Sequence, residues 1–141
     1  MAMLFSPAQV LDLTGISTER LRHWRKEMPE LAKHKGRSAS FSFEELVALS
    51  IMNRLSDELG MGAASLAPHS SSIFALLTEG AVIEDEGTVL CLSKSGVTIE
   101  QLPLSIDMPV MAVIRTDIVA NDLYSRVIDP TPLPQLDLPF G

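Results

Sequence analysis

Four cationic side chains lie close together near the start of the chain, at Arg20, Arg22, Arg25 and Lys26. A guanidinium carries a planar fork of N–H donors, which can bind a phosphate or the O6 and N7 atoms of guanine with two hydrogen bonds. Two small hydroxyl residues, Ser17 and Thr18, precede the cations. A Ser or Thr at a helix N-terminus can hold a phosphate. These residue types therefore favour the binding of a polyanion.

The distribution of charge supports this chemistry although the whole chain is acidic, with a formal net charge of −7. Residues 1–60 hold eight Lys or Arg and eight Asp or Glu, whereas residues 61–141 hold three and ten. Between Thr18 and Arg37, seven cations stand against three anions. Exposed charges act mainly within a Debye length of roughly 8 Å at physiological salt. A phosphate backbone would therefore meet a local positive charge.

A short helix is expected before the cations. Ser6 and Pro7 suit the N-cap and the first helical position, and Gln9 completes a capping box. Gly15 is expected to end this helix in the left-handed conformation.

A second helix is expected to carry the cations, beginning after Ser17 or Thr18 and stopping before Pro29. Its buried side is predicted to hold three apolar residues, Ile16, Leu21 and Trp24. Two short helices joined by a Gly-containing turn are the layout of a helix-turn-helix, whose second helix enters the DNA major groove.

The polar and basic stretch from Glu30 to Ser40 suits a β-hairpin wing with Gly36 near its tip, and Phe41 would anchor the return strand. Ser42 is expected to cap a third helix over 43–59. A further helix over 63–77 is expected to be broken, or begun again, at Pro68.

The pattern changes to short β-branched runs after Gly80. We expect an antiparallel β-meander with strands at 81–83, 88–92 and 97–102. Residues 110–114 are expected to form a further strand, which would be central because it is wholly apolar. A helix is predicted from Thr116 to near Asp129, with four side chains facing inward, at Ile118, Val119, Leu123 and Val127. The Pro-rich residues 130–141 are expected to form an extended tail.

With these residues laid out, the N-terminal half resembles the MerR-type winged helix-turn-helix. The resemblance rests on Phe5–Val10, Leu13–Ser17, Leu21–Trp24, Phe41–Ser42 and the helix that ends in Leu59–Met61. It implies that the recognition helix approaches bases or phosphates, that wing cations contact the flanking backbone, and that a dimer binds a two-fold related site. The predicted DNA-binding residues are Ser17, Thr18, Glu19, Arg20, Arg22, His23, Arg25, Lys26, Lys33, Lys35 and Arg37.

Two features depart from the family pattern. The family usually places an Arg two residues before the aromatic residue at the end of the wing, and this chain has Ala39 there. Classical members continue into a long coiled-coil helix and an effector site, whereas this chain turns into a β-rich segment. A metal-sensing or drug-sensing role is therefore not expected, and no cofactor or metal is predicted.

The remaining residues do not suggest catalysis. The carboxylates of Glu84, Asp85, Glu86, Asp117 and Asp122 lack a nearby His, a Gly-rich loop or a nucleophile, so acidic surface and helix caps are expected. His23 fits DNA contact and plain exposure equally well, His34 and His69 are expected to be solvated, and Cys91 is expected to be a buried thiol.

The sequence thus predicts an α+β protein that is not an enzyme: a winged helix-turn-helix with a connecting helix over 1–79, a β-rich dimerisation or partner-binding domain over 80–129, and the tail over 130–141. The expected function is that of a sequence-specific transcriptional regulator that binds double-stranded DNA as a homodimer through its C-terminal half, with an acidic surface for a protein partner. Two alternatives stay open: an excisionase-like or small-terminase-like architectural protein, and an adaptor with a vestigial winged helix. A cytoplasmic, nucleoid-associated location is expected, since no apolar run is long enough to cross a bilayer.

Overall fold

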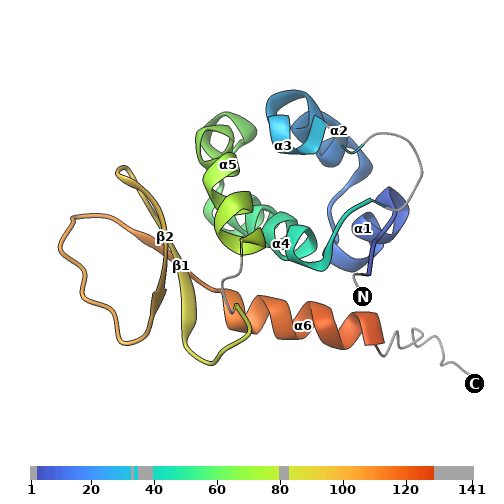
Figure 1. Ribbon diagram of the computed structural model, residues 1–141. Helices are drawn as coiled ribbons and strands as arrows, with labels where there is room; N and C mark the ends of the chain where they lie inside the picture. The colour runs from blue at the N-terminus through green and yellow to red at the C-terminus, as the bar shows by residue number, and fades with distance from the viewer. Residues whose placement is uncertain (1–2, 33, 35–39, 80–82, 129–141) are drawn as a thin grey trace, which may run out of the picture.

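A computed structural model describes residues 3–32, 34, 40–79 and 83–128 of the chain. Helices dominate the first half and a small sheet with one more helix forms the second, which confirms the α+β prediction (Figure 1). The helices are α1 (Pro7–Thr14), α2 (Thr18–Glu27), α3 (Pro29–Ala32), α4 (Phe43–Leu59), α5 (Ala63–Thr78) and α6 (Thr116–Ile128). The strands are β1 (Thr88–Ser93), β2 (Gly96–Gln101) and β3 (Ala112–Arg115).

Local capping sets the ends of α1 and α4. Ser6 and Ser42 each begin a helix with a complete capping box, as predicted. Gly15 ends α1 with a φ of 78° and Gly60 ends α4 with a φ of 69°. Both values lie in the left-handed region, where a Cβ is disfavoured, so a glycine is the residue that turns the chain at each point.

Helix α5 runs through Pro68 without a break, contrary to the predicted interruption. A proline inside a helix removes one backbone hydrogen bond. Apolar side chains on both sides of it, Leu66, Ile73 and Leu77, are fully buried, and α5 packs along α4. These tertiary contacts stabilise α5 as one continuous helix.

The sheet has the order β2-β1-β3 and is antiparallel throughout, so β1 is the central strand. The prediction that 110–114 forms a central strand is wrong, because β3 lies at an edge and Val110 is 79% exposed. The apolar composition of a strand does not determine which strands lie beside it in the sheet. Of the further strand predicted over 81–83, Ile83 is buried at the start of a turn rather than in a strand, and the other two residues lie outside the described part.

Helix α6 returns across the first half and packs against α1 and α4 (Figure 1). Val119 and Leu123 are buried in it as predicted, but Ile118 is 57% exposed and does not face inward. One hydrophobic cluster includes residues of both halves, from Phe5 to Leu123. None of the helices among the described residues is both long and apolar enough to span a membrane.

Candidate nucleic-acid interface

One side of helix α2 packs against the rest of the protein, and its other side faces solvent. Ser17 is the N-cap, and its Oγ accepts a hydrogen bond from the Arg20 amide at 3.0 Å. Leu21 and Trp24 are buried, and α2 packs against α3 and α5. The sequence therefore determines both the start of this helix and its orientation.

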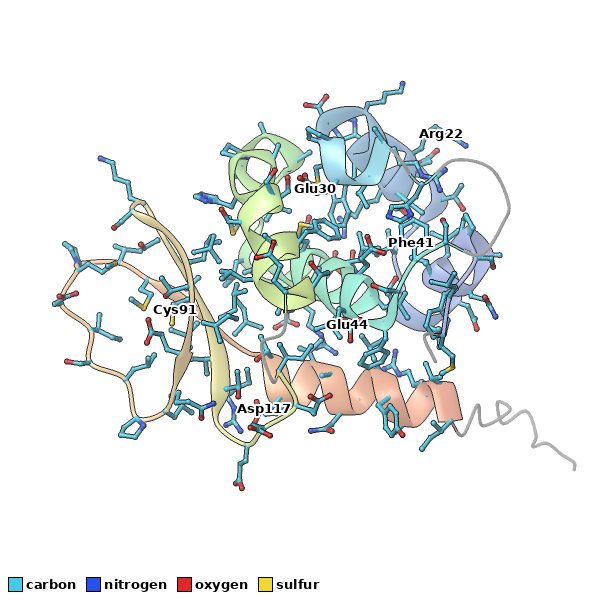
Figure 2. All side chains as sticks on the ribbon, in the orientation of Figure 1. Arg22, Glu30, Phe41, Glu44, Cys91 and Asp117 are labelled. Atoms are coloured by element: carbon cyan, nitrogen blue, oxygen red, sulfur yellow. The ribbon has the colours of Figure 1, made fainter. Side chains whose placement is uncertain are left out.

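The outward face of α2 is polar and charged. Six side chains of α2 are exposed: Thr18, Glu19, Arg22, His23, Lys26 and Glu27. The four-residue spacing from Arg22 to Lys26 puts both cations on one stripe of the helix. Figure 2 shows Arg22 on the opposite side of the molecule from Asp117, so this face points away from the sheet and α6. The described part of α2 thus presents to solvent a cationic stripe of Arg22 and Lys26, beside the exposed carboxylates of Glu19 and Glu27.

Arg20 lies differently from its neighbours. Its Nη1 donates to Asn53 Oδ1 at 2.6 Å and to Asp57 Oδ1 at 2.7 Å, both on α4. Its guanidinium carbon also lies 5.9 Å from the centroid of the Trp24 ring. Arg20 thus joins the predicted recognition helix to α4, and its contact with DNA stays a prediction.

Replacing Arg20 by alanine is expected to lower the free energy of unfolding by about 1 kcal/mol, because the buried Asn53 oxygen loses its donor. The dependence of DNA affinity on salt should not change, since a residue that only holds the helix contributes no phosphate contact. Urea unfolding and salt titrations of DNA binding measure the two effects. A salt slope reduced by about one unit would instead identify Arg20 as a phosphate contact.

Arg25 is half-buried rather than open to solvent. Its Nε and Nη2 are enclosed, and neither has a hydrogen-bond partner among the described residues. A residue enclosed in this way is less suited to direct DNA contact than Arg22 or Lys26.

The predicted wing is described only in part. Lys33, Lys35 and Arg37 lie outside the described residues. The start of the stretch is the short helix α3 rather than a hairpin strand, so that part of the prediction is wrong. Phe41 does pair with the start of the chain, because its backbone exchanges hydrogen bonds of 2.8 and 3.0 Å with Phe5.

His34 is buried, contrary to the prediction that it is solvated. Its Nε2 lies 2.9 Å from Glu45 Oε2, and its Nδ1 lies 3.1 Å from Ser40 Oγ. Its ring stacks on Phe41 with centroids 4.1 Å apart. Glu45 is also the capping-box residue of α4. His34, which lies within the predicted wing, thus connects Ser40 and Phe41 to the first turn of α4.

Replacing His34 by alanine is expected to destabilise the fold by about 2 kcal/mol, because Glu45 loses a buried partner and Phe41 loses its stacking contact. Denaturant unfolding measures the loss. His23→Ala is the matched control, since that side chain is exposed, and it should change stability by less than about 0.5 kcal/mol. Equal losses in the two variants would contradict the structural role of His34.

Two titratable groups of the second half, Asp117 and Cys91, are buried and have structural surroundings. Asp117 accepts hydrogen bonds from Arg115 and from the Gly87 and Ile118 amides, and the Arg115 guanidinium holds the pKa of its carboxyl well below the usual range. Cys91 is buried in the central strand, as predicted, and burial raises the pKa of its thiol. Neither group faces α2 (Figure 2).

Comparison with protein families gives one finding. Residues 5–67 match the family model of the MerR HTH family regulatory protein. The match identifies this N-terminal segment as a MerR-type helix-turn-helix domain, as the resemblance predicted, and such a domain suggests a DNA-binding regulator. Comparisons of the chain with curated proteins and with solved structures give no match.

Proposed function

We propose, from the MerR-type domain at residues 5–67, that this protein is a transcriptional regulator that binds specific sequences of double-stranded DNA as a dimer. The observation that carries the proposal is the exposed face of α2, with Arg22 and Lys26 on one stripe and Thr18 at its start. A helix-turn-helix presents such a face to the major groove.

The dimensions of α2 suit this task. Its ten residues make a rod of about 15 Å, and the major groove is roughly 12 Å wide. Arg22 and Lys26 would donate to phosphates or to guanine, and Glu19 can accept from the amino group of cytosine. The Ser17 hydroxyl oxygen accepts a hydrogen bond from the Arg20 amide. The O–H of Ser17 would therefore be available to donate a hydrogen bond to a phosphate.

Dimerisation and the acidic second half complete the proposal. Two linked copies would read two half-sites, which a single helix-turn-helix does not bind tightly. The acidic residues 61–141 would oppose non-specific binding to DNA and offer a surface for a protein partner. A cytoplasmic protein that associates with the nucleoid follows from this role.

The test is selection of duplexes from a random library by the purified chain, followed by fluorescence-anisotropy titration of the selected site. We expect two half-sites in inverted repeat and binding at least about 1,000-fold tighter than to unrelated duplex. An absence of binding to any duplex at low salt would refute the proposal.

The same experiment separates the two other candidates. Enrichment for bendable sequences without a repeated motif, together with strong bending of the bound duplex, would favour an architectural protein. A chain that binds no DNA but holds a stable protein partner would favour an adaptor. The exposed acidic turn at Glu84, Asp85 and Glu86 is the feature that such a partner would meet.

A further inference from the structure

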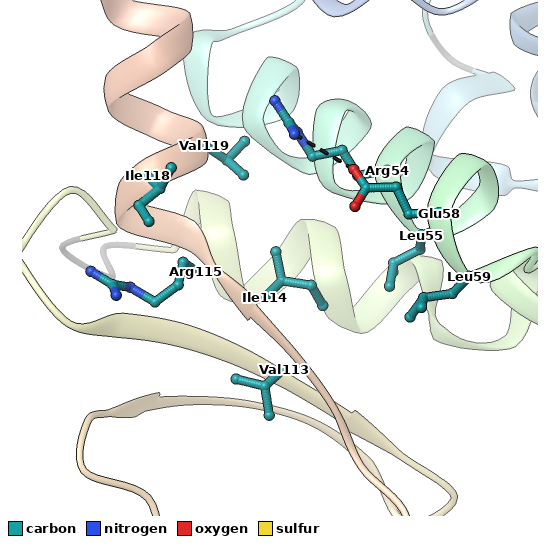
Figure 3. Close-up of a pocket in the computed structure, with 9 residues that line it drawn as sticks. All are labelled: Arg54, Leu55, Glu58, Leu59, Val113, Ile114, Arg115, Ile118 and Val119. Carbon is teal, nitrogen blue, oxygen red and sulfur yellow. Dashed lines mark ion pairs between the residues drawn. The ribbon is translucent and has the colours of Figure 1, made fainter.

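An apolar groove of about 290 Å³ lies on the side of α4 that faces β3 and the start of α6 (Figure 3). It is lined by Arg54, Leu55, Glu58, Leu59, Val113, Ile114, Arg115, Ile118 and Val119. Two of its apolar side chains are open to solvent, since Leu59 is 62% exposed and Ile118 57%. Val113, which is 41% exposed, borders the groove along β3, but its side chain lies on the opposite face of the strand from Ile114 (Figure 3). Large apolar side chains that gather at an exposed groove commonly mark an interaction site.

Strand β3 borders the groove and is an edge strand. Among the described residues it forms ladder pairs with β1 alone, so its outer backbone groups have no strand beside them. Proteins usually protect such an edge with charges or proline. Here three of the four residues are Ala112, Val113 and Ile114. The open edge therefore offers both backbone hydrogen bonds and an apolar surface.

The charges around the groove indicate what would fit it. Arg54 lies 3.7 Å from Glu58 and 3.8 Å from Asp122, and Arg115 pairs with Asp117 at 2.6 Å. Each of these cations already has an acidic partner within the chain. The rim is thus neither strongly positive nor strongly negative, and a nucleic acid or a charged peptide would gain little there. A neutral, apolar partner with its own open strand edge matches the surface.

We propose that the occupant is a second copy of this chain, whose β3 pairs antiparallel with the first to join the two sheets. An antiparallel pair of identical strands is compatible with a two-fold axis, so each edge satisfies the other and both grooves close together. The inference rests on the proposed function only in requiring two copies. It assigns the dimer contact to this surface in place of a coiled-coil helix.

The location also bears on DNA reading. Asn53 and Asp57, which hold Arg20 of the recognition helix, are sequence neighbours of Arg54 and Glu58 at the groove. The last turns of α4 therefore contact the recognition helix through Asn53 and Asp57, and line the proposed dimer surface through Arg54 and Glu58. Two copies joined at the groove would have their recognition helices placed through the same rigid element.

Sedimentation equilibrium of the full chain tests the proposal with a matched pair of variants. Ile118 and Ile106 are each 57% exposed, but Ile106 lies in the loop before β3 and does not line the groove. We expect the unmodified chain and Ile106→Glu to be dimers, and Ile118→Glu to raise the dimer dissociation constant by at least about 100-fold. Circular dichroism confirms that each variant is folded. The milder Ile118→Gln should give an intermediate shift.

Oxidative cross-linking adds a second readout. Cys91 is first replaced by alanine, because it lies opposite residue 113 in the β1–β3 ladder and could form a disulfide with it within one chain. In that background Val113→Cys should form a covalent dimer, because identical residues near the two-fold axis face each other, whereas Ile106→Cys should not. A monomeric unmodified chain, equal dimerisation of the two Ile→Glu variants, or cross-linking at 106 alone would overturn the proposal. A monomer that still binds a selected DNA site would refute the interface and the dimeric part of the proposed function, but not the binding of specific DNA. A dimer that binds no DNA would refute the function and not the interface.

Discussion

Replacing Arg22 and Lys26 together by alanine is expected to weaken binding to a selected duplex about 100-fold at low salt. Both side chains are exposed on one stripe of α2, and a lost contact of about 1.4 kcal/mol corresponds to a factor of ten. The slope of log affinity against log salt should fall by about two units, since two phosphate-binding cations are gone. Fluorescence-anisotropy titrations at several salt concentrations measure both quantities.

The matched control for this prediction compares two single variants, Lys94→Ala and Lys26→Ala. Each variant removes one exposed ammonium group, but Lys94 lies in the β1–β2 turn, on the sheet. Its loss should leave the affinity within about twofold and the salt slope unchanged. Similar losses at the two lysines would mean that the overall charge, rather than the face of α2, controls binding. That result would contradict the proposal that α2 is the recognition helix.

Replacing Asp117 by asparagine is expected to lower the free energy of unfolding by about 2–4 kcal/mol. Its carboxylate is 3% exposed and accepts four hydrogen bonds, two from Arg115 and one each from the amides of Gly87 and Ile118. An amide keeps the shape but turns one end into a donor facing other donors, so a buried network is left unsatisfied. Urea denaturation measures the change.

Asp122→Asn is the control for that variant, because Asp122 lies on the same helix but pairs at the surface with Arg126 at 3.0 Å. Surface ion pairs contribute little, so the change should stay below about 1 kcal/mol. A loss at Asp122 as large as that at Asp117 would show that general helix electrostatics, rather than the buried network, are responsible.

The stabilisation by Asp117 should also depend on pH. Arg115 first, and then the two backbone amides, lower the pKa of the folded carboxyl below its value in the unfolded chain, which is about 3.9. A group with a depressed folded pKa contributes stability that is fully present above the unfolded pKa and is lost as pH falls toward the folded one. The difference in stability between the unmodified chain and Asp117→Asn should therefore be constant near pH 6 and shrink below about pH 4. Urea denaturation repeated at each pH checks this, and a difference unchanged at pH 3 would contradict it.

Local signals in the sequence were sufficient for most of the helices. Ser6 and Ser42 with their capping-box partners, and Gly15 and Gly60 at the helix ends, act through backbone hydrogen bonds within a few residues. The cationic stripe of α2 could be predicted for the same reason, because a helical period fixes which side chains share a face. The position of Pro68 inside α5 was misjudged, since its cost is offset by packing that lies elsewhere in the chain.

By itself, then, the sequence determined a MerR-type helix-turn-helix with a polar, basic reading face, and an α+β second half with an unbroken α6. Only the tertiary structure determined which cations stay exposed on that face. Arg20 is held by Asn53 and Asp57, more than thirty residues away, and the burial of His34 depends on Glu45 and Phe41. It also decided that β3 is an edge strand, because strand order depends on which surfaces helices such as α6 cover. These features arise from contacts between distant segments, which no local period or motif encodes.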